Sequence, residues 1–196
     1  MAENSCLSMY PAKQVSVETG RRKSNEIWYV ARVRIGTEEN ARQRCLEQIS
    51  SELLKDCYVF CYEEKRHLYG DWIVKERVLF PGYVFLVSDG AYAKEINREL
   101  WRIKGIIGLL GMDNRLTMLN DEDVDFLLML GGRRQMVKFS EGIIEQSKVR
   151  VYSGPLVGKE KYIRKIDRHK RKAFLEMPIF GEKQKMQVGL EIVEKI

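Results

Sequence analysis

The hydrophobic pattern of the last quarter of the chain leaves little choice of fold. Beyond Lys148 apolar and polar residues alternate, and no helical period is present. Two runs each gather their apolar residues on one face: Ala173, Leu175, Met177 and Ile179, then Met186, Val188, Leu190 and Ile192. Polar turns at 168–172 and 181–183 separate these strands. Roughly 50 residues of short strands must close on themselves to bury a core, so we expect a small SH3-like β-barrel over residues 147–196.

Residues 26–131 carry a mixed pattern of strands and helices. Strands are expected at 27–34, 57–62, 72–78, 83–87 and 106–110, and helices at 38–53, 91–103 and 120–130. Thr37 and Asn120 are suited to cap the first and last helices, and Phe80-Pro81-Gly82 interrupts the strand pairing. The charged segment 63–70 is expected to be a loop. This order predicts an α+β domain, with helices on a largely antiparallel sheet.

Two segments lack a sustained hydrophobic period. We interpret residues 1–25 as a flexible tail and residues 132–146 as a linker between the two domains.

Composition argues against a membrane or secreted protein. No apolar run approaches the roughly 18 residues of a spanning helix, and the N-terminus lacks a signal-peptide core. A cytoplasmic protein without membrane contacts is therefore expected. The cysteine spacings fit neither a disulfide framework nor a zinc site. A metal site would have to recruit Cys45, Cys57, Cys61 and His67, and buried free thiols explain these cysteines better.

The positive charge is concentrated in the predicted barrel. Residues 148–196 hold 13 Lys+Arg against 6 Asp+Glu, whereas the whole chain holds 34 against 28, so the preceding residues are close to neutral. Such asymmetry favours a polyanionic partner. The candidate RNA-binding residues surround a basic hairpin tip: Lys159, Lys161, Arg164, Lys165, Arg168, His169, Lys170, Arg171 and Lys172. The alternative is an ordinary solvated turn.

The sequence contains no catalytic constellation. Gly154 to Lys159 resembles a phosphate-binding loop, but its glycines are separated by three residues and Glu160 follows the lysine. The two histidines, His67 and His169, fall in different predicted domains. The acidic run 121–125 is explained by the first turn of a helix. We therefore expect neither enzymatic activity nor a cofactor.

Aromatic residues concentrate around Trp28-Tyr29 and Phe80-Pro81-Gly82-Tyr83. Most aromatics at strand spacing belong to a core. Phe80 stands at a break in the strand, where a ring can be displayed instead of buried, and an exposed aromatic patch there would be a protein-docking surface.

These residues resemble a known family. Trp28-Tyr29-Val30, Leu79-Phe80-Pro81-Gly82-Tyr83-Val84 and Gly105-Ile106 with Gly108 are similar to the NusG N-terminal (NGN) domain. Ser153-Gly154-Pro155-Leu156 with Gly158, and the closing Gly189-Leu190-Glu191-Ile192-Val193, resemble the KOW domain that follows it. The resemblance covers residues 26–196.

The resemblance implies a transcription elongation and antitermination factor. Its NGN domain would bind the clamp helices of the largest RNA polymerase subunit, with Tyr29, Phe80, Pro81 and Tyr83 as candidate contacts. Its KOW domain would recruit RNA, a ribosomal protein or a termination factor, and the factor would act as a monomer.

The segment Glu63–Trp72 and the basic barrel look like the specialised LoaP branch, which implies that the KOW domain contacts a leader RNA hairpin of one operon. A general NusG factor with a protein-binding KOW domain is the alternative. An RNA-modifying enzyme with a KOW-like barrel would need a catalytic cluster, and the sequence offers none.

Overall fold

The computed structural model describes residues 25–104, 106–109 and 117–195. The predicted tail, residues 1–25, lies outside this range except for Asn25. The described residues divide into two compact units. The N-terminal unit comprises residues up to Val59 together with Phe80–Phe126, and the C-terminal unit comprises Phe60–Leu79 together with the residues from Leu127 onward.

The N-terminal unit is built on an antiparallel sheet in the order β2-β5-β1-β6. Its strands are β1 (Ile27–Val33), β2 (Asp56–Tyr58), β5 (Tyr83–Ser88) and β6 (Ile106–Leu109), and the short β7 (Thr117–Met118) also pairs with β1. The central strand β1 carries β-branched and aromatic residues that are nearly all buried, as expected of a strand covered on both faces. β1 pairs antiparallel with β5, from Ile27 opposite Ser88 to Arg32 opposite Tyr83.

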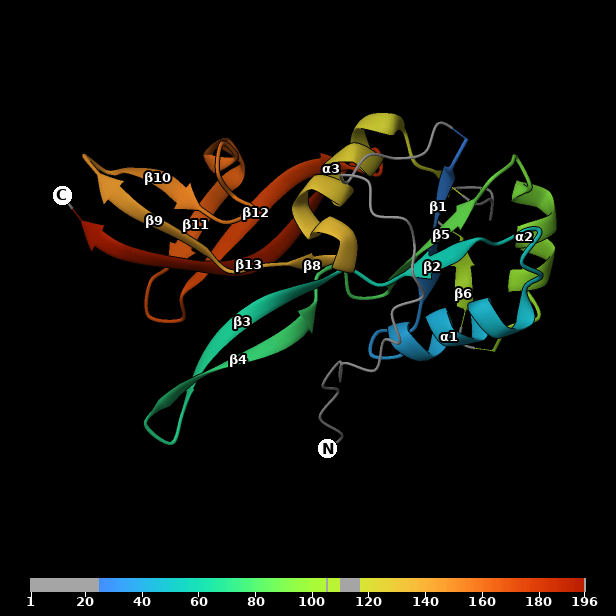
Figure 1. Cartoon of the computed structure of the whole chain (residues 1–196), viewed down its shortest axis with the longest axis horizontal. Helices are drawn as coiled ribbons and strands as arrows, with labels where there is room; N and C mark the ends of the chain where they lie inside the picture. Colours follow the sequence, from blue (N-terminus) through green and yellow to red (C-terminus); the bar gives the residue numbers. More distant parts are fainter. Residues whose placement is uncertain (1–24, 105, 110–116, 196) are drawn as a thin grey trace. The chain divides into compact units, whose positions relative to one another are not determined.

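Two helices lie beside this sheet (Figure 1): α1 (Glu38–Gln48) and α2 (Ala93–Leu100). A third helix, α3 (Asp121–Gly131), begins in the N-terminal unit and ends in the C-terminal unit. The expected cap of α3 is confirmed, because Asn120 Oδ1 accepts a hydrogen bond of 2.7 Å from the Asp123 amide. Thr37 stands at the start of α1 but does not cap it with its side chain. Its hydroxyl donates instead to the Arg34 carbonyl at 2.7 Å. Helix α1 ends earlier than predicted.

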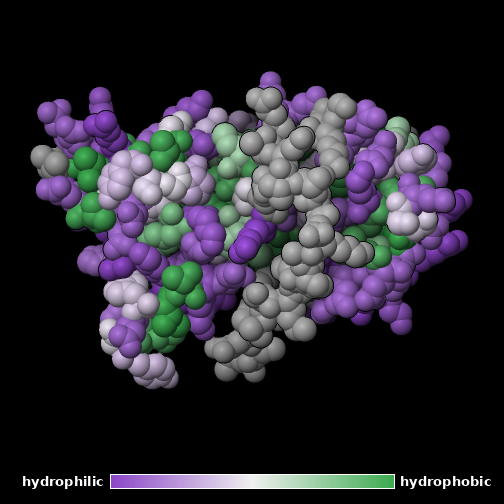
Figure 2. All heavy atoms as spheres, viewed as in Figure 1, coloured by the Kyte–Doolittle hydropathy of each residue, from purple (hydrophilic) through white to green (hydrophobic). Residues whose placement is uncertain are grey.

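The segment 63–70 is not a loop, so that prediction is wrong. β3 (Cys61–Leu68) pairs antiparallel with β4 (Asp71–Val78), from Cys61 opposite Val78 to Leu68 opposite Asp71. We call this pair the β3–β4 hairpin (Figure 1). The sequence pattern did not indicate this strand, because its charged residues are stabilised by ion pairs rather than by burial of apolar side chains. Figure 2 shows apolar surface at this hairpin, where Leu68 and Val74 are exposed.

The C-terminal sheet has five strands in the order β10-β9-β13-β12-β11. They are β9 (Ser140–Glu145), β10 (Lys148–Ser153), β11 (Ile163–Asp167), β12 (Lys172–Ile179) and β13 (Glu182–Lys195). A 3-10 turn, η2 (Glu160–Tyr162), precedes β11. The predicted alternation is confirmed, because Ala173, Leu175, Met177 and Ile179 are all buried on β12. β11 is an edge strand, so the backbone N–H and C=O groups on its outer side have no neighbouring strand in this sheet.

The segment predicted to be a linker, residues 132–146, holds the 3-10 turn η1 (Gly132–Arg134), β8 (Met136–Val137) and the strand β9. Its low hydrophobic periodicity therefore does not mean a lack of regular structure. β8 pairs in parallel with β3, so it belongs to the same small sheet as the β3–β4 hairpin. The domain boundaries at 26–131 and 147–196 stay predictions.

Candidate functional site

The predicted RNA-binding residues run from the 3-10 turn η2 along the edge strand β11 and the following turn to the start of β12. Asp167 organises this turn, because its Oδ1 accepts a 2.9 Å hydrogen bond from the Lys170 amide. That hydrogen bond, together with the charges of Lys170 and His169, lowers the pKa of Asp167 below its usual range. Arg171 closes the turn in a left-handed conformation, with φ of 51°. The local chain therefore presents residues 168–170 to solvent.

Most of these side chains are accessible. The exposed residues are Lys161, Arg164, Lys165, Arg168, His169 and Lys170, and we call this set the outer basic cluster. Lys159, Arg171 and Lys172 are half-buried. Within the outer basic cluster, Lys161 Nζ lies 4.9 Å from the centre of the Tyr162 ring, as expected of a cation–aromatic contact. Lysines and arginines displayed on an edge strand and its turn can bind phosphate oxygens without rearranging the core.

Two of the predicted residues are already engaged by the β3–β4 hairpin. Lys172 Nζ pairs with the carboxylate of Glu64. The Arg171 guanidinium lies 3.7 Å from the centre of the Trp72 ring, and its Nη1 is 2.8 Å from Glu191 Oε1. The nine predicted residues therefore separate into the six of the outer basic cluster, an inner pair formed by Arg171 and Lys172, and the half-buried Lys159, whose ammonium donates to the Val157 carbonyl at 3.3 Å.

Glu64 is the most buried acid of the hairpin, with an exposed fraction of 3%. Burial alone would raise the pKa of this carboxyl group. Hydrogen bonds from Lys172 and Arg77, with the nearby charge of Arg66, outweigh burial and lower the pKa below its usual range. The Glu64 Oε2 atom lies 3.2 Å from Nε of both Arg66 and Arg77. Glu64 is thus ionised at neutral pH. Its Oε1 atom binds the Lys172 ammonium, and its Oε2 atom binds Arg66 and Arg77.

Further contacts join the hairpin to the C-terminal sheet. Lys65 Nζ lies 2.7 Å from Glu191 Oε2 and 4.2 Å from the centre of the Phe139 ring. Glu63 accepts hydrogen bonds from the Lys138 ammonium at 2.6 Å and the Phe139 amide at 3.0 Å. Sequence patterning missed this contact, because partners such as Lys65 and Glu191 are 126 positions apart.

The four residues predicted to contact the polymerase lie in the N-terminal unit and differ in exposure. Tyr29 and Phe80 are buried, Tyr83 is half-buried, and Pro81 is exposed. Phe80 is 4% exposed and packs edge-on against Phe85, with ring centres 5.6 Å apart. Of the two arrangements open to Phe80, the structure has the buried one. A break in a strand releases the backbone from pairing, but it does not turn the side chain outward.

Within the turn at Phe80–Tyr83, Pro81 is nevertheless exposed. The Gly82 amide donates a 2.8 Å hydrogen bond to Glu38 Oε1, and the Val33 amide donates one of 2.8 Å to the Gly82 carbonyl. Glu38 is buried, so these bonds fix the turn against the start of α1. Ile35, with an exposed fraction of 73%, lies beside this turn, because a Cβ added to Gly82 would meet its Cγ1 at 3.3 Å. Sequence reasoning missed both Glu38 and Ile35.

The exposed Ile35 and Pro81 with the half-buried Tyr83 form what we call the turn patch. Exposed apolar groups around a rigid turn are suited to contact another protein. An isoleucine in a loop between a strand and a helix is the signal that could have identified it.

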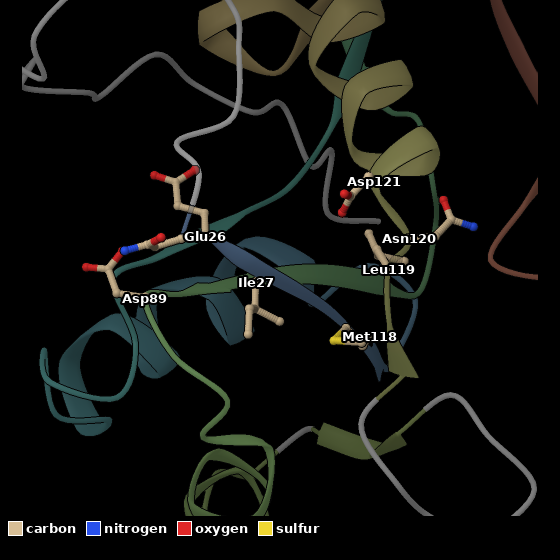
Figure 3. A pocket seen from close by; sticks show the side chains of 8 residues that line it. Glu26, Ile27, Asp89, Met118, Leu119, Asn120 and Asp121 are labelled. Atoms are coloured by element: carbon tan, nitrogen blue, oxygen red, sulfur yellow. The ribbon is translucent and has the colours of Figure 1, made fainter.

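A surface hollow of about 570 Å³ lies elsewhere in the N-terminal unit. It is lined by Glu26, Ile27, Asp89, Met118 and Asp121, among others. Figure 3 shows the Glu26 and Asp89 side chains at one side and Met118 at another. It contains none of the predicted site residues.

The described residues contain no group of His, Cys, Asp and Glu able to hold a metal ion. Cys45, Cys57 and Cys61 are buried free thiols, as the sequence predicted. Burial also raises the pKa of the Cys57 thiol, which keeps it protonated and unreactive. No helix within the described ranges is long and apolar enough to cross a membrane.

Together the two units define a class of protein: an α+β unit with an apolar turn patch and an all-β unit with a basic edge. A family model described as "Transcription termination factor nusG" matches residues 26–128. The match covers more than half of the chain, and the chain belongs to the NusG family of non-enzymatic transcription factors. Membership of this family implies binding to RNA polymerase.

Relatives and a solved structure agree with this assignment. The chain is 27% identical over 180 residues to the transcription termination/antitermination protein NusG of Thermus thermophilus, covering 86% of this chain and 97% of the relative. It is 29% identical over 133 residues to the NusG protein of Borreliella burgdorferi, covering 63% and 71%. A structure described as "Domain interaction in Thermotoga maritima NusG" matches 85% of this chain and 94% of that chain, with a TM-score of 0.51 and 18% identity. The predicted α+β fold with a C-terminal all-β region is confirmed.

Proposed function

We propose that this protein is an operon-specific antiterminator of the LoaP type, which binds RNA polymerase through its N-terminal unit and RNA through its C-terminal sheet. The observation that carries this proposal is the outer basic cluster on the edge strand β11 and its turn. A chain whose positive charge lies on one accessible edge is suited to bind nucleic-acid phosphates. The protein would act in the cytoplasm as a monomer and without a cofactor.

The polymerase contact is assigned to the turn patch. Its exposed members can reach the clamp helices directly, whereas Tyr29 and Phe80 are buried and cannot. Glu38 holds the turn rigid through its bond to the Gly82 amide. A rigid apolar patch loses little conformational entropy on docking. Bound there, the protein would favour the closed clamp by its higher affinity for that state.

The test is single-round transcription by bacterial RNA polymerase through a terminator. One template carries the leader of a long neighbouring operon, and the other carries the same leader in scrambled order. We expect readthrough that depends on the native leader and is lost in the Arg168→Ala/Lys170→Ala variant. Equal readthrough on both templates would contradict an operon-specific function.

A general NusG factor is the second candidate. The C-terminal sheet also exposes Tyr152, Val157 and Val193, and such apolar side chains favour a protein partner. That partner would be a ribosomal protein or a termination factor. Leader-independent effects on pausing, together with an unchanged response in the Arg168→Ala/Lys170→Ala variant, would support this candidate.

A further inference from the structure

The β3–β4 hairpin offers the inner basic pair the same chemical groups that a nucleotide offers. A nucleotide presents a phosphate oxygen to a cation and an aromatic face to a guanidinium or a side-chain ring. Glu64 presents a carboxylate to Lys172, and Trp72 presents an aromatic face to Arg171. Both contacts lie within the C-terminal unit, in which the hairpin and the C-terminal sheet pack together.

Lys172 is held by an acid that has its own support on the hairpin. Glu64 is buried and is fixed there by Arg77 and Arg66. The Lys172 side chain is itself only 15% exposed in this arrangement. A phosphate can therefore reach the Lys172 ammonium only where Glu64 has withdrawn.

Arg171 is enclosed in a similar way. Trp72 lies against its guanidinium, and Glu191 accepts a bond from Nη1. Its backbone is fixed as well, because its carbonyl accepts a 3.0 Å hydrogen bond from the Leu190 amide. The side chain therefore cannot swing to a new partner by a movement of the turn, and the groups that cover it must move instead. Trp72 is 40% exposed and close to the end of the hairpin, so its ring is the group that can move away from Arg171.

We propose that the β3–β4 hairpin and RNA compete for Arg171 and Lys172, so that the docked hairpin limits RNA to the outer basic cluster. This inference rests on the proposed RNA-binding function. RNA that reaches the inner pair must displace Glu64 and Trp72, and a factor with an undocked hairpin binds RNA more tightly. Docking of the hairpin and binding of RNA to Arg171 and Lys172 are thermodynamically linked, so each weakens the equilibrium constant of the other by the same factor.

The test compares the full-length protein with three hairpin variants. Trp72→Ala removes the ring over Arg171, and Glu64→Gln removes the charge that holds Lys172. Tyr69→Ala is the matched control, because it deletes a fully exposed aromatic side chain from the tip of the same hairpin. The probe is a fluorescein-labelled RNA hairpin of arbitrary sequence at low salt, where phosphate contacts dominate binding. Thermal melts establish that each variant is folded.

Competition predicts that Trp72→Ala and Glu64→Gln each raise the affinity for the RNA probe by at least about 5-fold, and that Tyr69→Ala leaves it unchanged. Hydrogen exchange gives a readout that needs no variant. Saturating RNA should speed the exchange of the β3–β4 amides in the unaltered protein. If Glu64→Gln fails to fold, Trp72→Ala and hydrogen exchange still decide the question.

Unchanged or weaker RNA binding by Trp72→Ala, with slower exchange of the hairpin amides on adding RNA, would overturn the inference and make the hairpin part of the RNA site. The proposed function fails in a different way. In that case Arg168→Ala/Lys170→Ala would bind the RNA probe as well as the unaltered protein does, or no form would bind it at all. Absence of binding by every form would overturn both proposals.

Discussion

Gly189 lies where β13 passes beneath the β3–β4 hairpin, and its replacement by alanine tests how tightly these two elements are packed. An added Cβ would lie 2.2 Å from Phe139 Cδ2 and 2.5 Å from the Glu63 carbonyl oxygen. The Phe139 ring can rotate, but the carbonyl belongs to the backbone of β3 and can move only with the hairpin. Gly189 is not among the glycines with positive φ, so crowding rather than backbone strain accounts for the cost.

Overpacking of this kind costs about 1–3 kcal/mol, and sometimes more. Since the contact involves a backbone carbonyl, we expect Gly189→Ala to lose about 3 kcal/mol of unfolding free energy in urea denaturation. In a unit of the size of the C-terminal one, each kcal/mol of unfolding free energy that is lost lowers Tm by about 4–8 °C.

Gly70→Ala is the control, because Gly70 has φ of 95° and open space around its Cα. Gly70→Ala should lower the free energy of unfolding through backbone strain alone, by about 1 kcal/mol. If Gly189→Ala is no more destabilising than Gly70→Ala, and hydrogen exchange in the hairpin is unchanged, the close packing of hairpin and sheet is refuted.

Three further predictions follow from the geometry. Phe80→Ala should destabilise the N-terminal unit by about 3–5 kcal/mol in urea denaturation, and a normal melting curve for this variant would contradict the burial of Phe80. Ile35→Ser should instead weaken binding to purified polymerase without changing the melting curve. Asn120→Ala should cost about 1 kcal/mol through loss of the α3 cap, and Asn120→Asp should restore most of that stability. Glu64 has a folded-state pKa below its ordinary value of about 4.3, so its contribution is present above that pH and is lost as pH falls through the lowered pKa. Urea denaturation between neutral and acidic pH should therefore show a steeper loss for the unaltered protein than for Glu64→Gln.

The sequence predicted those parts of the fold that depend on apolar periodicity. The alternating run from Ala173 to Ile179 became β12 with every apolar member buried, and Asn120 began α3 as expected. These features are local, because a period of two or a capping residue specifies its own structure.

The β3–β4 hairpin escaped prediction because charge, not apolar burial, stabilises it. Glu63, Glu64, Lys65 and Arg66 follow one another, and a charged run of this kind is typical of a loop. Glu63, Glu64 and Lys65 each have a partner more than seventy positions away in the chain, at Lys138, Lys172 and Glu191. No local pattern relates an acid in one segment to a base in another. The inner and outer basic residues could not be separated for the same reason.

The exposure of the docking residues was equally inaccessible to sequence reasoning. Phe80 and Pro81 are neighbours, yet one is buried and the other exposed. The turn that carries them is held by Glu38, which accepts a hydrogen bond from the Gly82 amide 44 positions away in the chain. The basic edge on β11, by contrast, could be found from charge alone.

The path of β13 has a consequence for the order in which the C-terminal sheet forms. The strand pairs antiparallel with its neighbour β12 up to Gly189, and from Leu190 onward it pairs in parallel with β9. The first pairing closes a tight turn, whereas the second joins segments separated by about 50 residues and carries a larger loop-closure entropy. During synthesis the β12–β13 hairpin can assemble as soon as it emerges from the ribosome. β9 emerges much earlier and can pair at once with β10, which follows it directly, but its other edge stays unpaired until β13 has been synthesised.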